Sequence, residues 1–297
     1  MRVLISGASG LVGTEVARQL IAEGHEPLRL VRRKPSATDE VEWDPSRGFI
    51  QEGIMETVDA VVNMAGATTG KIPWTAKYKN EIVSSRIDST KTLVAAMSSA
   101  KKNPAVLVSG SASGFYGDSG NKILSEESPK GQGFLSDLAN AWEQEALKAP
   151  AEVRVVLART TMVMSRRLGA LGRLLPLIKL GIGGPLGSGK QWWAWISLPD
   201  EAAAIIHLIK TSAARGPYNL TAPEPATCGQ IVKSLAKDLK RPSFISVPTF
   251  ALKMLIGEAA VELLLCSQNM TADRLIETGF KFQHPTLKAA SAWVVNR

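Results

Sequence analysis

Gly7, Gly10 and Gly13 recur at intervals of three residues in the sequence GASGLVG, directly after the apolar run Arg2–Ser6. A turn of this composition between a strand and a helix lets a pyrophosphate approach the backbone and the positive end of the helix dipole. Gly7 would allow the tight turn, Gly10 would leave space for the phosphates, and Gly13 would let the helix pack on the sheet. The alternative is a glycine-rich turn that binds nothing. The position between a strand and an amphipathic helix favours dinucleotide binding.

A basic cluster follows the second expected strand. Arg32, Arg33 and Lys34 stand where an NAD-binding domain usually has an acidic residue for the ribose 2′-hydroxyl, about twenty residues after the glycines. Guanidinium groups instead bind a 2′-phosphate through paired, charge-assisted hydrogen bonds. The cluster therefore predicts NADP(H) as the cofactor, with a solvated basic turn as the alternative. The sequence NMAG at residues 63–66 ends another apolar run and would approach the adenine and ribose.

Short apolar runs alternate with helical patterns through the first half of the chain. Runs that are apolar almost throughout predict strands buried on both faces of a parallel sheet. Helices are expected between the first two runs, ending near Gly24, and from Thr75 to Ala100. The expected strands are Arg2–Ser6, Glu26–Val31, Ala60–Met64, Ala105–Ser109 and Val153–Ala158.

The predicted fold class is α/β: a Rossmann-type, doubly wound parallel sheet with a smaller, mainly helical C-terminal substrate-side domain. We place an NADP-binding domain at residues 1–165, whose sheet later segments can complete, and the substrate-side region at residues 166–297. In that region Leu180–Trp195 contains five glycines and three tryptophans, which form either a pocket wall or a tight connection packed by its own rings. Strands are expected at 217–220 and 244–247, and helices at 227–239 and 249–265.

Composition narrows the classes of partner. The net charge of +8 attracts anions, but the basic residues are scattered and no aromatic platform accompanies them, so we expect no nucleic-acid partner. No apolar run is long enough to span a membrane, and the three histidines have no metal-ligand spacing, so neither a membrane partner nor a metal is expected. Two isolated cysteines and the absence of a signal-peptide pattern predict a cytoplasmic protein. The sequence leaves open whether the protein is a monomer or a homodimer.

Motifs along the whole chain are similar to those of a known family. GASGLVG, NMAG and SGSASGFYGD (109–118) resemble the extended short-chain dehydrogenase/reductase superfamily. Trp74, Glu81 and Arg86 on one helix, and the sequence LGIGGPLGSGKQWWAWI, resemble an atypical branch of NAD-dependent epimerase/dehydratase-like proteins. That branch is also labelled SulA-like cell-division inhibitor. The segments GPYNLTAPEPAT, FALKMLIGE and TGFKFQHPTLKAA complete the likeness.

The resemblance implies a set of cofactor-binding residues. The pyrophosphate would contact Gly7, Ser9, Gly10, Leu11 and Val12, alongside Gly13. Arg32 and Arg33 would bind the 2′-phosphate, and Met64 and Ala65 would line the adenosine side. Glu81 and Arg86 would also belong to the cofactor site, with an exposed ion pair as the alternative.

The chain departs from the superfamily in its catalytic motif. In the superfamily the Tyr-x-x-x-Lys pair exchanges a proton while hydride moves. None of the three tyrosines has a lysine four residues later, and the segment Phe134–Ala139 has neither residue where the pair should fall. Ser111 matches the family's carbonyl-binding serine within about one residue, and Tyr116 is a candidate substitute acid, with a packed ring as the alternative. Ser197 replaces a histidine that is common in relatives.

Two functions remain open at this point. The first is an NADP(H)-dependent oxidoreductase or epimerase-like enzyme, slow without its proton donor, acting on an unidentified carbonyl or sugar-like substrate. The second is a non-catalytic regulatory protein that senses NADP(H).

Overall fold

The structure is a computed structural model that describes residues 1–166 and 169–296. Within these residues an eight-stranded sheet has the order β11-β8-β6-β5-β1-β2-β3-β4, and neighbouring strands run parallel except β3 and β4. Its strands are β1 (Arg2–Ser6), β2 (Glu26–Val31), β3 (Glu40–Asp44), β4 (Phe49–Ile50), β5 (Ala60–Asn63), β6 (Val106–Ala112), β8 (Arg154–Thr160) and β11 (Gly216–Leu220). The predicted fold class is confirmed.

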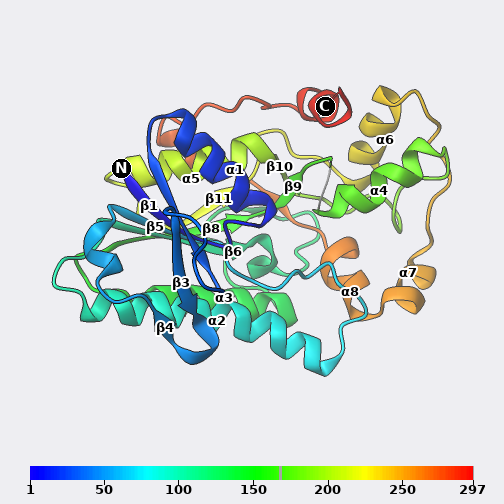
Figure 1. Ribbon diagram of the computed structural model, residues 1–297. Helices are drawn as coiled ribbons and strands as arrows, with labels where there is room; N and C mark the ends of the chain where they lie inside the picture. The colour runs from blue at the N-terminus through cyan, green and yellow to red at the C-terminus, as the bar shows by residue number, and fades with distance from the viewer. Residues whose placement is uncertain (167–168, 297) are drawn as a thin grey trace.

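Helices cover both faces of this sheet (Figure 1). They are α1 (Leu11–Ala22) and α5 (Leu198–Lys210) on one face, and α2 (Ala76–Ser99) and α3 (Phe134–Ala146) on the other. Alternate strand residues point to opposite faces. Val3 and Ile5 therefore join the cluster under α1 and α5, and Leu4 joins the cluster under α2 and α3. This burial on both faces explains why β1 is apolar throughout.

Most of the remaining elements form a second layer beyond the carboxyl ends of the strands. A cluster around the fully buried Trp195 joins α4 (Gly169–Lys179), α6 (Cys228–Asp238) and α10 (Leu287–Asn296). The other helices are α7 (Thr249–Ile256), α8 (Glu258–Ala260) and α9 (Asp273–Glu277). Two small ladders pair β9 (Met162–Met164) with β10 (Trp195–Ser197), and β7 (Ile123–Leu124) with β12 (Asn269–Met270). Helical turns lie at Pro45–Arg47, Ile54–Thr57, Ser113–Tyr116 and Val261–Leu265.

Comparison with the structure corrects several of the expected elements. The expected strand 244–247 is wrong: Val247 forms one isolated bridge with Leu186, and no strand is formed there. The expected helix 249–265 is interrupted at Gly257, whose φ of +59° breaks the right-handed helix. Strands β3 and β4 were not expected. The expected long helix is confirmed as α2, with Thr75 capping its start.

Segments that come after residue 165 contribute to the large sheet and its helical cover. Both α5 and β11 come later in the chain and complete the Rossmann-type layer, with β11 pairing along β8. In the part of the chain that the structure describes, no helix has the length and hydropathy needed to cross a membrane.

Candidate cofactor site and the adjoining polar network

The three glycines of the first turn have different surroundings. Gly7 has a φ of +67°, and a Cβ atom there would lie 2.5 Å from the carbonyl oxygen of Met64. A Cβ on Gly13 would collide with the backbone of Gly7 and Ala8. At Gly10 the nearest atom to an added Cβ would be the Gly7 oxygen, at 3.1 Å, and the residue is exposed. Internal packing therefore requires glycine at positions 7 and 13, and much less so at position 10.

The start of α1 is suited to bind an anion. Gly10 is the N-cap residue, no side chain caps the helix, and its first turn contains no acidic residue. The first N–H groups of a helix lack intrahelical partners and lie at the positive end of its dipole. Ser9 is exposed, and Leu11 and Val12 are half-buried beside it. These residues fit a pyrophosphate.

Arg32 and Arg33 are both exposed just after β2, but their side chains are in different states. Arg33 donates to both carboxylate oxygens of Glu40, with Nη1–Oε2 and Nη2–Oε1 distances of 2.8 and 2.6 Å. This pairing lowers the pKa of Glu40 to about 2. Arg32 forms no side-chain hydrogen bond or ion pair with any residue that the structure describes. Arg33 is therefore held in place by β3, while the Arg32 guanidinium is available to a ligand.

The carboxyl ends of β1 and β5 are fastened together by side chains. The Ser6 hydroxyl donates to Asn63 Oδ1 at 2.6 Å and accepts from the Ala65 N–H at 3.1 Å. Met64 and Ala65 are thus held directly beside Gly7. The bond between Ser6 and Asn63 was not expected from the sequence, because both lie within apolar strands and their pairing depends on strand register.

Arg86 and Glu81 are not paired with each other. Arg86 Nη1 donates to the carbonyl oxygens of Ala67 and Ile82, each at 3.0 Å, and its guanidinium lies 5.3 Å from the centre of the Trp142 ring. Burial lowers the pKa of Arg86 to about 10. Glu81 is exposed, and no ion pair joins it to Arg86. Arg86 therefore supports the loop that follows β5, and the exposed ion pair considered as an alternative is not formed.

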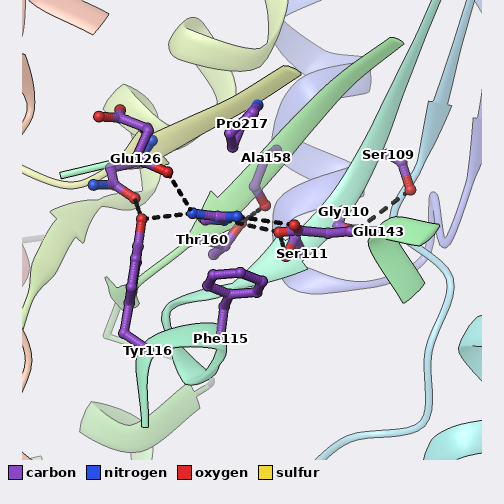
Figure 2. A network of polar contacts seen from close by, with 12 residues as sticks. Ser109, Gly110, Ser111, Phe115, Tyr116, Glu126, Glu143, Ala158, Thr160 and Pro217 are labelled. Carbon is purple, nitrogen blue, oxygen red and sulfur yellow. Dashed lines mark hydrogen bonds and ion pairs between the residues drawn. The ribbon is translucent and has the colours of Figure 1, made fainter. Parts of the chain in front are cut away.

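Ser111 and Tyr116 belong to one buried polar network at the carboxyl ends of β6, β8 and β11 (Figure 2). Ser111 Oγ donates to Glu143 Oε1 at 2.6 Å, and Arg159 donates to both oxygens of the same carboxylate at 2.8 and 2.9 Å. The Tyr116 hydroxyl accepts from Arg159 Nη1 at 2.8 Å and donates to Asn219 Oδ1 at 2.7 Å. The network thus brings the two catalytic candidates, Ser111 and Tyr116, together, but both are buried in the protein interior.

Within this network the hydroxyls of Ser111 and Tyr116 find their hydrogen-bond partners in the protein itself, so neither hydroxyl requires a substrate. The side chains of Arg159 and Glu143 are only 4% and 5% exposed, so each charge depends on the other for compensation. Burial raises the pKa of Tyr116 to about 12, because the phenolate would lose its hydration. Tyr116 is a weak acid at neutral pH and its ring is packed. The geometry gives it a structural role and argues against its use as a substitute proton donor.

The start of α3, where the Tyr-Lys pair of the superfamily should fall, is occupied by side chains from other segments. Glu262 accepts from the N–H groups of Phe134 and Leu135, each at 3.2 Å, and Gly133 has no side chain that would exclude it. The ammonium of Lys79 lies 4.2 Å from the centre of the Phe134 ring. Nothing in the local sequence marked Glu262, because it comes from a segment more than a hundred residues later.

A serine, a histidine and an aspartate also meet at the start of α5. Ser197 Oγ donates to Asp200 Oδ2 at 2.7 Å and lies 3.0 Å from His284 Nδ1. A nucleophilic triad requires opposite ring nitrogens to face the serine and the carboxylate. Here Nδ1 is also the nitrogen near Asp200, at 3.5 Å, and Ser197 is fully buried as a helix cap. The cluster fastens the C-terminal segment to α5. Among the described residues, no group of three metal-ligating side chains is assembled.

Residues 3–221 match the model of the NAD dependent epimerase/dehydratase family, and residues 247–294 match a domain of unknown function, DUF1731. The chain belongs to the NAD dependent epimerase/dehydratase family. The resemblance seen in the sequence motifs is therefore confirmed at the level of the family.

Relatives extend over the full length of the chain. The epimerase family protein ML0860 of Mycobacterium leprae is 36% identical over 296 residues, which are 99% of this chain and 96% of that protein. A crystal structure of human epimerase family protein SDR39U1 with NADPH has a TM-score of 0.92 and 30% identity, covering 100% of this chain and 99% of that one. A nucleoside-diphosphate sugar epimerase from Corynebacterium glutamicum has a TM-score of 0.79 and 29% identity, covering 98% of this chain and 57% of that one.

Proposed function

We propose that the protein is an NADP(H)-binding, atypical short-chain dehydrogenase/reductase that acts as a slow oxidoreductase on a carbonyl or sugar-like substrate. The observation that most directly supports cofactor binding is the uncapped start of α1 beside the exposed Gly10, followed by the Arg32 guanidinium, which is unpaired within the described residues. The human relative crystallised with NADPH supports the same cofactor. The two free cysteines support a cytoplasmic location.

Each part of the site has a distinct task in this proposal. The amides of Ser9 to Val12 bind the pyrophosphate, and Gly10 leaves the phosphates room to approach. Arg32 binds the 2′-phosphate directly, while Arg33 presents its remaining donors from a position held by Glu40. Met64 and Ala65 line the adenosine side, and Arg86 shapes the loop behind them. The bound cofactor supplies or accepts a hydride.

The preference for NADPH over NADH tests the cofactor assignment. We expect NADPH to bind about tenfold more tightly or better, because the 2′-phosphate meets a guanidinium. Arg32→Ala should remove most of this preference, whereas Arg47→Ala, an exposed arginine of another turn, should leave it unchanged. Fluorescence titration of both cofactors measures the effect. Equal affinities in the unmodified protein would refute the assignment.

A second function, a non-catalytic sensor of NADP(H), is favoured by one feature. Ser111 and Tyr116 both have hydrogen-bond partners in the network around Arg159, and the first turn of α3 has neither a tyrosine nor a lysine where the superfamily places its proton donor. A sensor would bind NADPH and leave it unoxidised with every carbonyl substrate. Turnover with any substrate in a purified preparation would exclude this second function.

A further inference from the structure

Helix α7 and the end of α4 lie at one edge of the molecule, on the right in Figure 1, and this edge carries exposed apolar side chains. We call it the α7 surface and define it by exposed apolar side chains. These are Leu180, Ile182, Phe244, Phe250, Met254 and Leu255. The two segments that form it are adjacent: Gly187 N–H donates to the Val247 carbonyl at 2.8 Å, and Val247 N–H donates to Pro185 at 3.0 Å.

Helix α7 has the composition of a core helix without the burial. Its sequence is TFALKMLI, and of its eight residues, all described, only Leu252 is buried. Phe250, Met254 and Leu255 expose 69%, 81% and 74% of their surface. Exposed apolar side chains concentrated in one short helix in this way mark an interaction site, because leaving them in water is costly.

The same two segments contain cations but no acid. Residues 169–199 and 239–257 include no aspartate or glutamate. Their six cationic residues are Arg173, Lys179, Lys190, Lys240, Arg241 and Lys253. None of these six side chains forms an ion pair with a residue that the structure describes. Four of these cations, Lys179, Lys240, Arg241 and Lys253, lie in or next to the segments that carry the exposed apolar side chains. The α7 surface therefore combines apolar side chains with positive charge that is unpaired within the described residues.

The combination of exposed apolar side chains and positive charge indicates which kind of partner this surface binds. Apolar side chains that enter the headgroup region, flanked by lysine and arginine, are the features of a protein that binds an anionic lipid surface. A second copy of the chain packed on a twofold axis would bring these cations against one another. Nucleic acid would bind the cations through its phosphates, but it would leave apolar side chains such as Leu255 and Met254 without apolar contacts.

We propose that the α7 surface docks the protein on the surface of an anionic phospholipid bilayer. The contact is interfacial, with α7 lying along the membrane, so it requires no membrane span. It also modifies the expectation that the protein has no membrane partner, which rested on the absence of a long apolar run. The proposal does not depend on the proposed oxidoreductase function.

Sedimentation with lipid vesicles tests this proposal on the full-length protein. We expect binding to phosphatidylcholine vesicles containing about 30% phosphatidylglycerol, and little binding to pure phosphatidylcholine. Raising the salt to about 0.5 M NaCl should release most of the protein, because it screens the charges. The double variant Phe250→Ser/Met254→Ser should lower binding about tenfold or more. Removing cations in Lys240→Gln/Arg241→Gln/Lys253→Gln should also lower it.

Matched controls separate this surface from general charge and hydrophobicity. Ile21→Ser/Ile123→Ser changes two apolar residues that are similarly exposed elsewhere, and Lys101→Gln/Lys102→Gln/Lys122→Gln removes the same charge. Both should bind like the unmodified protein. Three outcomes would overturn the proposal: no sedimentation with either vesicle, equal binding to neutral and anionic vesicles, or a dimer in light scattering that Phe250→Ser/Met254→Ser dissociates. The last would show that a second copy covers the surface.

Discussion

At the scale of single residues, Gly10 and Gly13 lack side chains for different reasons. Gly13 packs against the backbone of Gly7, whereas Gly10 is exposed, with a φ of −79° that any residue can adopt. We therefore expect Gly10→Val to fold and to lose NADPH binding, because the side chain fills the space meant for the phosphates. Gly13→Ala should lower the free energy of unfolding by about 1–3 kcal/mol through overpacking. Calorimetric titration and urea unfolding distinguish the two effects. Undiminished NADPH binding in folded Gly10→Val would show that the GASGLVG motif is only a turn and does not bind the phosphates.

Glu201 predicts a dependence of stability on pH. It is fully buried in the first turn of α5, accepts from Thr160 Oγ1 at 2.6 Å, and has no partner for Oε2 within the described structure. Burial raises its pKa to about 8, so the folded protein keeps a proton that the unfolded chain releases near its ordinary pKa. Stability from this group is therefore complete at low pH and falls as the pH rises toward about 8.

The measurement is urea unfolding at about pH 5.5 and about pH 8.5, comparing the protein with Glu201→Gln. The loss of stability between these pH values should be smaller in the variant, by on the order of a few kcal/mol. Glu152→Gln serves as the control, since this carboxylate is exposed and its pKa is lowered rather than raised. Identical pH dependence in the protein and Glu201→Gln would show that Glu201 is already ionised in the folded state.

At the scale of elements, the buried network joins β6, β8, β11 and α3 through the Arg159 guanidinium. Tyr116→Phe removes the hydroxyl between Arg159 and Asn219 and leaves both polar groups buried. We expect the free energy of unfolding to fall by about 1–3 kcal/mol, with NADPH affinity unchanged. Any residual turnover should also be retained, because the tyrosine is not a proton donor. If Tyr116→Phe is as stable as the unmodified protein but loses its activity, Tyr116 is the proton donor after all.

The elements that could be predicted from the sequence are those whose pattern is local. Strands buried on both faces, such as β1, appear as apolar runs, and α2 is bounded by its own cap at Thr75. The sequence does not predict strand β3 (EVEWD), because its acidic residues are explained only by contacts with residues outside the strand. The main example is the pairing of Glu40 with Arg33. The pairing of Ser6 with Asn63 and the contact of Glu262 with the start of α3 likewise join residues that are far apart in the sequence. No local sequence pattern therefore predicts them.

At the scale of the whole molecule, the proposed catalysis would depend on what the C-terminal region brings to the start of α3. It brings the Glu262 carboxylate, already bonded to two backbone N–H groups, beside the apolar ring of Phe134. General acid–base help is typically worth about a hundred- to ten-thousandfold in rate. We therefore expect very slow oxidation of NADPH with ordinary ketones and sugar nucleotides. Activated quinones or dicarbonyls should react faster, because hydride transfer to them needs little more than proximity and orientation.

Stopped-flow loss of NADPH absorbance across such a panel measures this, with Ser111→Ala and Tyr116→Phe alongside. If Ser111 orients a carbonyl despite its bond to Glu143, Ser111→Ala lowers the residual rate more than it lowers stability. Rapid turnover of an unactivated sugar nucleotide would contradict the expected slow rate, and would require an acid outside the network and the first turn of α3. Tight NADPH binding with no turnover on any substrate would instead favour the sensor, since binding and hydride transfer would then be separated in one molecule.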